Sequence, residues 1–391
     1  MLSILWILLP IAVLVGWLAA KRDKLGRQRF LYYLSLRYLL DTKSNNPENI
    51  GEKLSELPPS YQDNSTILSL TLGDVFRKKG EIERAISIHQ YIASSDTIDL
   101  AEKKTAQWSL ALDFIAAGLL DRAEDLLREL IPESEFTQRA LLKLTHIYEQ
   151  QHDWLQAISC LERLDLVQDH YAEIAHLYCE LAEENLQNNA ESALSFAHAA
   201  LNIYPNSARA SLIIAFIAIK NNDQLLASTM LSAIENQSIN LTPLIAPIMQ
   251  YIHKDQPEIF LIWLENTLMR HPHIILFLMK THYLIMHESA QAALSFLEQT
   301  LLVHPNFQGL LNFHQLNKWL YPNKNIDKNK TDIYAITFDK IVDHYAKYRC
   351  QACGFVSKSL NWHCPSCQAW DTASPVADII SLKSLSNSPG A

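Results

Sequence analysis

Four cysteines near the end of the chain have the spacing of a metal site. They form two Cys-x2-Cys pairs separated by ten residues, made of Cys350, Cys353, Cys364 and Cys367. Each pair spans a tight turn that brings its two sulfurs together, so two pairs can supply four thiolates to one tetrahedral ion. Gly354 follows the first pair, where such a turn often needs a positive φ. The spacing predicts a structural metal site, and zinc (Zn2+) is the expected metal.

The metal and the ligand set each have one alternative. The paired cysteines resemble those of rubredoxin, which binds iron for electron transfer, so iron (Fe) is the alternative metal. However, Gln368 follows the second pair, where rubredoxin usually has glycine. His363 stands beside Cys364 and is an alternative ligand, although four thiolates already complete a tetrahedral shell. So small a ribbon buries too little apolar surface to be stable alone, and bound metal would contribute directly to its folding.

The composition argues against several functions. The length of 391 residues suggests two or three domains, and a net charge of −9 disfavours a general nucleic-acid binder. Residues 345–391 hold only four Lys or Arg against two Asp, too weak a charge to track phosphates. The nine glycines build neither GxGxxG nor GxxxxGKS/T, and neither HExxH nor GxSxG occurs. We therefore expect neither an enzyme nor a nucleic-acid partner.

Residues 1–20 have the composition of a membrane-spanning helix. The nineteen residues from Leu2 to Ala20 are almost wholly apolar, and at about 1.5 Å each they span roughly 28 Å, close to the hydrocarbon thickness of a bilayer. Trp6 and Trp17 lie near the ends, as interfacial aromatic residues often do. A signal peptide would carry its basic residues before the apolar stretch, and a buried core helix would lack such charged flanks. A membrane anchor is the better interpretation.

Basic residues after the anchor predict its orientation. Six of them lie between Lys21 and Arg37, with a single acidic residue among them. Because Lys and Arg flanking a first span stay on the cytoplasmic side, the N-terminus should face outward and residues 21–391 should be cytoplasmic. A reducing cytoplasm also keeps thiols free for metal. Cys160 and Cys179 stand apart in apolar helical patterns, where we expect them to be buried small hydrophobic side chains.

Residues 65–320 have the pattern of a helical repeat, which makes the fold class all-α. A small or apolar residue in each second helix recurs at intervals of 38, 34, 36, 34, 33 and 33 residues. These marker residues are Ala85, Ala123, Ala157, Ala193, Ala227, Phe260 and Ala293. Because the tetratricopeptide repeat (TPR) has a period of 34, the pattern predicts a TPR α-solenoid rather than an ordinary helical bundle. The juxtamembrane segment is 21–64, and within it residues 30–64 are a candidate for one further degenerate unit, with Ile50 at the marker position.

Turn and packing residues support this period. Residues twelve positions before the markers, beginning with Gly73 and Ala111, are mostly small or apolar where paired helices would cross. Aromatic residues follow at Phe76, Phe114 and Tyr148, turn signals lie at Gly80, Gly118, 151–153, 188–189 and 221–223, and Pro205, Pro272 and Pro305 end three units. A solenoid presents an extended surface and usually no closed catalytic pocket, so its expected role is to hold proteins or peptides.

Three segments complete the predicted domain organisation. Residues 321–344 read as a polar linker with an amphipathic segment, 345–378 as a rubredoxin-like zinc ribbon, and 379–391 as a Ser-, Pro- and Gly-rich flexible tail. Three aromatic residues of the ribbon should pack beside the metal or against the repeats: Phe355, Trp362 and Trp370.

The whole arrangement resembles the lipopolysaccharide assembly protein B (LapB, or YciM) family of Gram-negative bacteria. The resemblance covers nearly the full chain and weakens between about 240 and 345. Its most specific segments are Leu72–Arg77 with Gly80-Glu81, Arg84–Ile86 and Ile88–Gln90, then Ala117–Asp125, Ile174–His176 with Tyr178–Ala182, and Tyr348–Cys350 with Trp362–Cys367.

This resemblance implies a regulatory function. The family consists of adaptors tethered to the inner membrane, single-pass with a periplasmic N-terminus, that promote degradation of the deacetylase LpxC by the protease FtsH. LpxC commits precursors to lipid A, so lipopolysaccharide output is matched to demand. The implied partners are FtsH, LpxC and inner-membrane proteins that sense or assemble lipopolysaccharide, with a homo-oligomer left open. The alternative is a TPR scaffold for lipopolysaccharide synthesis and export that has no direct proteolytic role.

Overall fold

The computed structural model describes residues 62–96, 98–321 and 347–376. The predicted membrane anchor at 1–20, the degenerate unit around Ile50, most of the linker and the tail at 379–391 lie outside the described residues. Within the described part of the chain, no helix is both long and apolar enough to cross a membrane.

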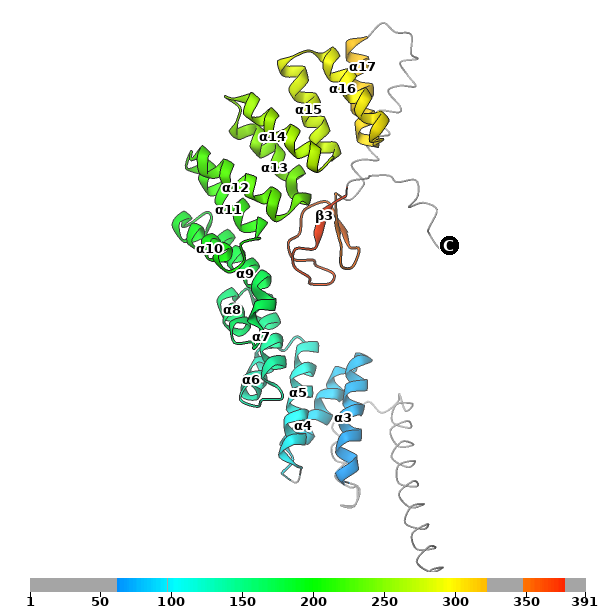
Figure 1. Cartoon of the computed structure of the whole chain (residues 1–391). Helices are drawn as coiled ribbons and strands as arrows, with labels where there is room; N and C mark the ends of the chain where they lie inside the picture. Colours follow the sequence, from blue (N-terminus) through cyan, green and yellow to red (C-terminus); the bar gives the residue numbers. More distant parts are fainter. Residues whose placement is uncertain (1–61, 97, 322–346, 377–391) are drawn as a thin grey trace, which may run out of the picture. The chain divides into compact units, whose positions relative to one another are not determined.

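From residue 62 to residue 321 the chain folds into antiparallel helix pairs (Figure 1). The first helices of the pairs are α3 (Gln62–Lys78), α5 (Leu100–Ala116), α7 (Thr137–Gln151), α9 (Tyr171–Asn185), α11 (Ala208–Lys220), α13 (Thr242–Ile252) and α15 (Ile274–His287). The second helices are α4 (Ile82–Ser94), α6 (Leu120–Leu130), α8 (Trp154–Glu162), α10 (Ala190–Ile203), α12 (Gln224–Gln237), α14 (Pro257–Arg270) and α16 (Ala290–Val303). Helix α17 (Phe307–Leu320) follows, and the 3-10 helices η2 (Val167–His170) and η3 (Ile239–Leu241) precede α9 and α13. The predicted TPR-like solenoid is confirmed.

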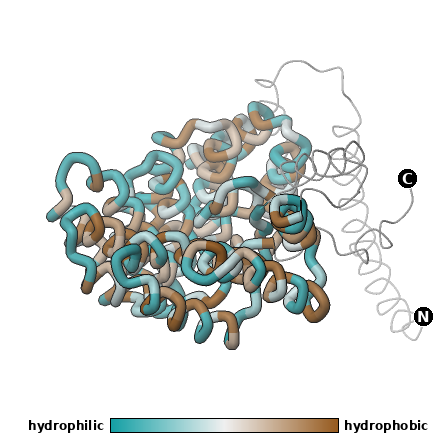
Figure 2. The backbone as a smooth tube through the Cα atoms, turned by 90° about the horizontal axis from the view of Figure 1, so that it is seen from above, coloured by the Kyte–Doolittle hydropathy of each residue, from teal (hydrophilic) through white to brown (hydrophobic). Residues whose placement is uncertain are grey.

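The helices belong to two compact units. Unit 1 ends at Asp165, and unit 2 runs from Leu166 and includes the ribbon. Figure 2 shows apolar and polar residues alternating along the helices of the described chain. This alternation gives each helix one face for packing and one for solvent.

A repeated turn ends the first helix of several pairs. Gly80, Gly118, His152 and Asn222 all have left-handed backbone, with φ of 82°, 74°, 59° and 59°. The next residue donates its amide to a carbonyl five positions back, as Glu81 does to Phe76 at 2.9 Å. Such a turn satisfies carbonyls that the helix end leaves without partners. The residues predicted as turn signals therefore end these helices.

The marker residues lie where paired helices touch. All six marker alanines are fully buried, and Phe260 is 1% exposed. The partner position in the first pair is Gly73, where an added Cβ would lie 2.3 Å from Nε2 of His89. Glycine is needed here because the imidazole packs directly on the backbone of α3.

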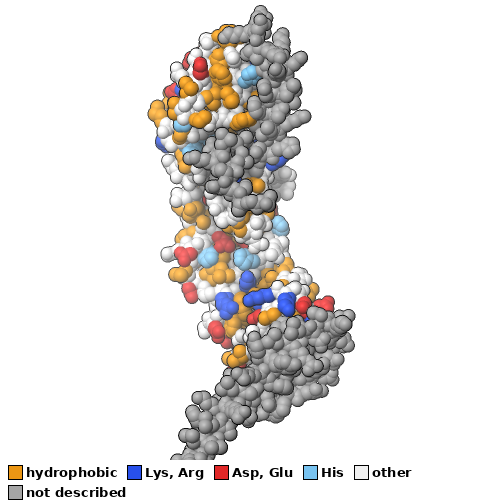
Figure 3. Space-filling model, turned by 90° about the vertical axis from the view of Figure 1, so that its right-hand side faces the viewer, with side chains coloured by type: hydrophobic (Ala, Val, Ile, Leu, Met, Phe, Trp, Pro, Cys, Tyr) orange, Lys and Arg blue, Asp and Glu red, His pale blue; other side chains and the backbone are white. Residues whose placement is uncertain are grey.

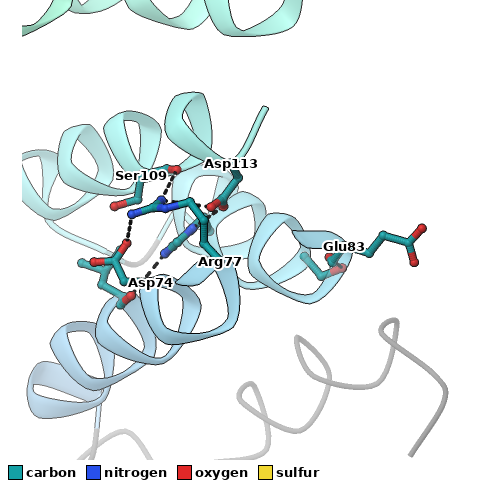
Figure 4. A network of polar contacts seen from close by, with 8 residues as sticks. Asp74, Arg77, Glu83, Ser109 and Asp113 are labelled. Atoms are coloured by element: carbon teal, nitrogen blue, oxygen red, sulfur yellow. Dashed lines mark hydrogen bonds and ion pairs between the residues drawn. The ribbon is translucent and has the colours of Figure 1, made fainter. Parts of the chain in front are cut away.

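A buried polar network joins the first pair to α5 in unit 1 (Figure 4). The guanidinium of Arg77 donates to Oδ1 of Asp113 at 3.0 Å, to the carbonyl of Ser109 at 3.0 Å and to Oδ1 of Asp74 at 2.6 Å. The second oxygen of Asp113 lies 2.5 Å from Nδ1 of His89. The Asp113 carboxylate therefore has a cation on one oxygen and an imidazole on the other.

Both central side chains of this network are sealed from water. His89 and Asp113 have no exposed side-chain surface. The remaining ring nitrogen of His89 lies 3.2 Å from the carbonyl of Leu70. A buried carboxylate is costly unless it is paired and hydrogen-bonded, and here every partner comes from the solenoid itself.

The ribbon is a small antiparallel sheet. Strand β1 (Tyr348–Cys350) pairs with β2 (Val356–Ser357) on one side and β3 (Ala373–Pro375) on the other, in the order β2-β1-β3. Figure 1 shows it beside the helices of unit 2. The predicted ribbon is therefore present at the end of a mostly helical chain.

Candidate metal centre and the surface that holds it

The two cysteine pairs sit in turns of the same backbone geometry. The amides of Cys350 and Cys364 each donate to a carbonyl five residues further on, at 2.7 and 3.0 Å. Their carbonyls accept from the amides of Gly354 and Gln368, at 2.9 and 2.8 Å. Both of these last residues have left-handed backbone, with φ of 79° and 58°. The second turn thus imposes on a glutamine the conformation that glycine adopts freely in the first.

The four thiols converge on one point. Their sulfur atoms all lie within 4.8 Å of one another. Sγ of Cys350 is 3.8 Å from that of Cys367, and Sγ of Cys353 is 3.7 Å from that of Cys364. Zn–S bonds of about 2.3 Å place the sulfurs of a tetrahedral site about 3.8 Å apart, whereas a disulfide would bring them to about 2.05 Å. The cluster therefore fits a metal ion, and all four cysteines are free of disulfides.

A hydroxyl group supports the charged form of one thiol. Oγ1 of Thr372 lies 3.1 Å from Sγ of Cys350, and this contact, with backbone amides of the first turn, lowers the pKa of Cys350 to about 6. Hydrogen bonds to a thiolate favour the form that binds metal. The bound ion would cross-link the two turns, because each turn supplies two of the four sulfur atoms.

His363 is engaged elsewhere. Its Nε2 lies 2.9 Å from the carbonyl of Gln368, to which it can donate, and its ring stacks on Trp370 with centroids 4.4 Å apart. The sulfur cluster does not include it. The imidazole therefore braces the second turn, and the alternative in which His363 is a ligand finds no support in its position.

The ribbon packs on unit 2 through its aromatic residues. The ring of Trp370 stacks on His176 of α9, with centroids 5.1 Å apart and planes 13° from parallel. Trp362 lies 6.2 Å from the same imidazole and packs, with Leu360, against the apolar core around α11 to α15. Phe355 remains 38% exposed. The expectation of packing against the repeats is confirmed for the two tryptophans.

A buried arginine lies beneath this contact. Arg209 on α11 is 3% exposed, and its guanidinium lies 5.9 Å from the centre of the Trp362 ring. It donates to Glu183 and Glu180 of α9, each at 2.9 Å. Burial alone would lower the pKa of Arg209, but the hydrogen bonds and charges of the two glutamates raise it above its ordinary value. Arg209 therefore stays charged under an indole ring of the ribbon.

His176 is neutral in this position. Burial, reinforced by the positive charge of Arg209 and by His363, lowers the pKa of His176 to about 3. Its Nδ1 has no hydrogen-bond partner among the described residues. The ring therefore acts as a flat packing surface for the ribbon.

The isolated cysteines behave as predicted. Cys160 and Cys179 are 6% and 0% exposed. Burial raises the pKa of the Cys160 thiol above its ordinary value and that of Cys179 to about 12. Neither thiol is a reactive or metal-binding group.

Comparison with known proteins places the chain among its relatives. Residues 348–375 match the family model described as a rubredoxin metal binding domain. Lipopolysaccharide assembly protein B of Escherichia coli K12 is 29% identical, with 98% of this chain and 100% of that protein covered. The protein of the same name from Haemophilus influenzae Rd is also 29% identical, over 97% and 99% of the two chains.

Solved structures overlap only in part. YrrB, described as a TPR protein with an unusual peptide-binding site, has a TM-score of 0.32 at 16% identity and covers 48% of this chain and 93% of its own. A MamA structure has a TM-score of 0.32 at 17% identity, covering 46% and 95%. Overlaps this partial say nothing about what the chain binds. The chain is thus similar to lipopolysaccharide assembly protein B over nearly its whole length and carries a matching ribbon, in agreement with the resemblance seen in its sequence.

Proposed function

We propose that the chain is a membrane-tethered cytoplasmic adaptor that regulates lipopolysaccharide biosynthesis by promoting FtsH-dependent degradation of LpxC. The observation that carries the proposal is the near full-length similarity to lipopolysaccharide assembly protein B. Helix pairs followed by a docked ribbon suit a protein that holds others. Partners would include FtsH, LpxC and inner-membrane proteins that sense or assemble lipopolysaccharide.

The predicted anchor fits this role. A tether at residues 1–20 would confine the helix pairs near a membrane protease and raise their effective concentration there. It would be a single span of the inner membrane, with a periplasmic N-terminus. A chain that starts near Lys21 should then fold but regulate poorly.

The metal in the proposal is zinc. Four thiolates at tetrahedral spacing suit a structural zinc site, and zinc has no redox chemistry that would need a partner. Iron is the alternative, and a visible absorption band in the purified protein would identify it.

The half-life of LpxC in the native host tests the proposal. Depletion of this protein should lengthen the half-life, and inactive FtsH should remove the difference. An unchanged half-life would reject the adaptor function and favour the second candidate, a TPR scaffold for lipopolysaccharide synthesis and export.

A further inference from the structure

Unit 1 carries a compact basic surface on the first helices of its pairs. We define the basic surface as Lys104 and Trp108 on α5 with Arg139 and Lys143 on α7. Figure 3 shows Lys and Arg side chains gathered on this face. The chain as a whole has a net charge of −9, so this concentration of positive charge is local.

Arg139 lies over two aromatic rings. Its guanidinium lies 4.4 Å from the centre of the Trp108 ring and 5.9 Å from that of Phe136. Trp108 is 7% exposed, and the centre of its ring lies 6.0 Å from that of Phe136. Both rings are therefore held in place by the core. Stacking restrains the side chain without using its N–H donors. Arg139 has no carboxylate partner among the residues that the structure describes.

A second unpaired cation stands one helical turn along. Lys143 follows Arg139 at i+4 on α7, and the described residues offer it no ion-pair partner. Like charges at this spacing repel and slightly destabilise a helix. The ammonium group of Lys104 lies 3.6 Å from Glu133, which is 45% exposed. The Lys104 side chain is 21% exposed, and a partly exposed ion pair at this distance is weak, so Lys104 can also meet another carboxylate.

We propose that the basic surface binds an acidic, extended segment of a partner protein. The few residues that contribute most of the binding energy at protein interfaces are often Trp and Arg. The basic surface combines an arginine restrained on a tryptophan with a second cation that has no ion-pair partner among the described residues. A carboxylate could take the free donors of Arg139 while a second one meets Lys143. This inference names the chemistry of a partner and rests on the proposed adaptor function.

The charges around the surface favour a peptide over a membrane. Glu133, whose side chain is 45% exposed, lies against Lys104. An anionic bilayer would bring phosphates against this carboxylate as well as against the cations. An extended peptide can place single carboxylates on the cations and leave Glu133 in water.

Fluorescence anisotropy on the purified full chain in zwitterionic nanodiscs tests the inference. The probe is a short fluorescein-labelled peptide with glutamate at every second position, and its control has glutamine instead. Arg139→Ala should weaken peptide binding about tenfold, and Lys143→Glu should weaken it further still. Binding to the unmodified protein should fall as ionic strength rises.

The matched control is Arg122→Ala. Arg122 is also an exposed arginine of unit 1 lying 5.7 Å over an aromatic ring, Phe114, but it belongs to a second helix, α6. It should leave binding unchanged. Equal loss in Arg122→Ala, unchanged binding in both Arg139→Ala and Lys143→Glu, or equal binding of the glutamine peptide would overturn the proposal.

Two further readouts keep the result unambiguous. Circular dichroism melting must match the unmodified protein, and Lys143→Glu, at a position that is not buried, serves if Arg139→Ala does not fold. Loss of peptide binding in nanodiscs containing phosphatidylglycerol would show that lipid occupies the surface and would overturn the proposal. Peptide binding and LpxC half-life are separate measurements, so the inference and the proposed function can fail independently.

Discussion

Each unit pairs an arginine with buried or partly buried carboxylates, but the two sites are covered by different means. In unit 1, Arg77 meets Asp113, and helices α3, α4 and α5 supply every partner. In unit 2, Arg209 meets Glu180 and Glu183, and the covering ring is Trp362 of the ribbon. Among the described residues, the first site is closed by helices of the solenoid, and the second is covered by a ribbon whose folding we expect to depend on a bound metal.

The two sites should therefore depend on different parts of the protein for their stability. The unit 1 network should persist as long as the helix pairs persist. The unit 2 site should depend on the ribbon, because loss of the ribbon would expose both Arg209 and the apolar face around Trp362. Metal binding at the cysteines would thereby control whether the surface of α9 and α11 is covered by the ribbon or exposed to water.

Metal removal should give the largest effect. Replacing Cys350 and Cys353 by Ser should abolish metal binding, which in small zinc modules contributes on the order of 10 kcal/mol to folding. Metal analysis should show the loss, and hydrogen exchange should rise in the ribbon and in α9 and α11 but not in α3 to α5. Cys160→Ser is the control and should retain the metal. Unchanged exchange in α9 and α11 would break the comparison.

Asp113→Ala should be the most damaging single change in unit 1. Removing one partner of a buried pair costs about 3–5 kcal/mol, since Arg77 and His89 lose their shared carboxylate. Asp74→Ala removes a partner of the same arginine that is 40% exposed, and should cost about 1 kcal/mol or less. Urea unfolding followed by hydrogen exchange in unit 1 separates the two. Equal costs would show that the network is not sealed as described.

The sequence predicted neither of these two polar sites, although segments that resemble the family include one half of each. The segments that carry the family resemblance contain Gly73, Arg77 and His89 in unit 1 and His176 and Glu180 in unit 2. Their partners gave no signal. Asp113 is one of several polar residues within a predicted helix, and Arg209 lies in the first turn of a helix that is otherwise mostly apolar.

The physical reason is the nature of the repeat signal. A period of about 34 marks where helices cross closely, and crossing requires small residues at fixed spacing. Polar contacts between successive units depend on rotamers and on which helices are neighbours, and neither follows from the period. The four cysteines were identifiable because their ligand geometry is local to each pair, whereas the surface on which the ribbon packs is assembled from distant segments.

Trp370→Ala should loosen the ribbon without removing its ligands. The stacked contact with His176 is lost, at a cost of about 2 kcal/mol for an aromatic side chain that is partly buried. Hydrogen exchange should rise in α9 while metal content stays constant. Phe355→Ala, at an exposed site of the same ribbon, should change neither quantity.

Acidification should weaken the same contact. The folded pKa of His176 is about 3, below its ordinary value near 6.5, so the unfolded state binds a proton first as pH falls. Stability should therefore decline between about pH 6.5 and pH 3, by roughly 1.4 kcal/mol per pH unit. His176→Phe keeps the stacking and removes the titration, so its urea midpoint should vary less between pH 6.5 and pH 5. Parallel pH profiles for the two proteins would contradict the assignment.

Gln368→Gly should give the smallest effect and the opposite sign. The two cysteine turns have the same pattern of backbone hydrogen bonds. However, the second turn has Gln368 at φ 58° in the position where the first has Gly354 at φ 79°. A non-glycine residue in left-handed backbone costs roughly 1 kcal/mol, so relieving it should strengthen metal retention slightly against a chelator. Gly354→Ala is the matched reverse change. Space is open around its Cβ position, so any weakening must come from backbone strain alone. If both variants released metal at the unmodified rate, left-handed backbone at these turns would carry no cost.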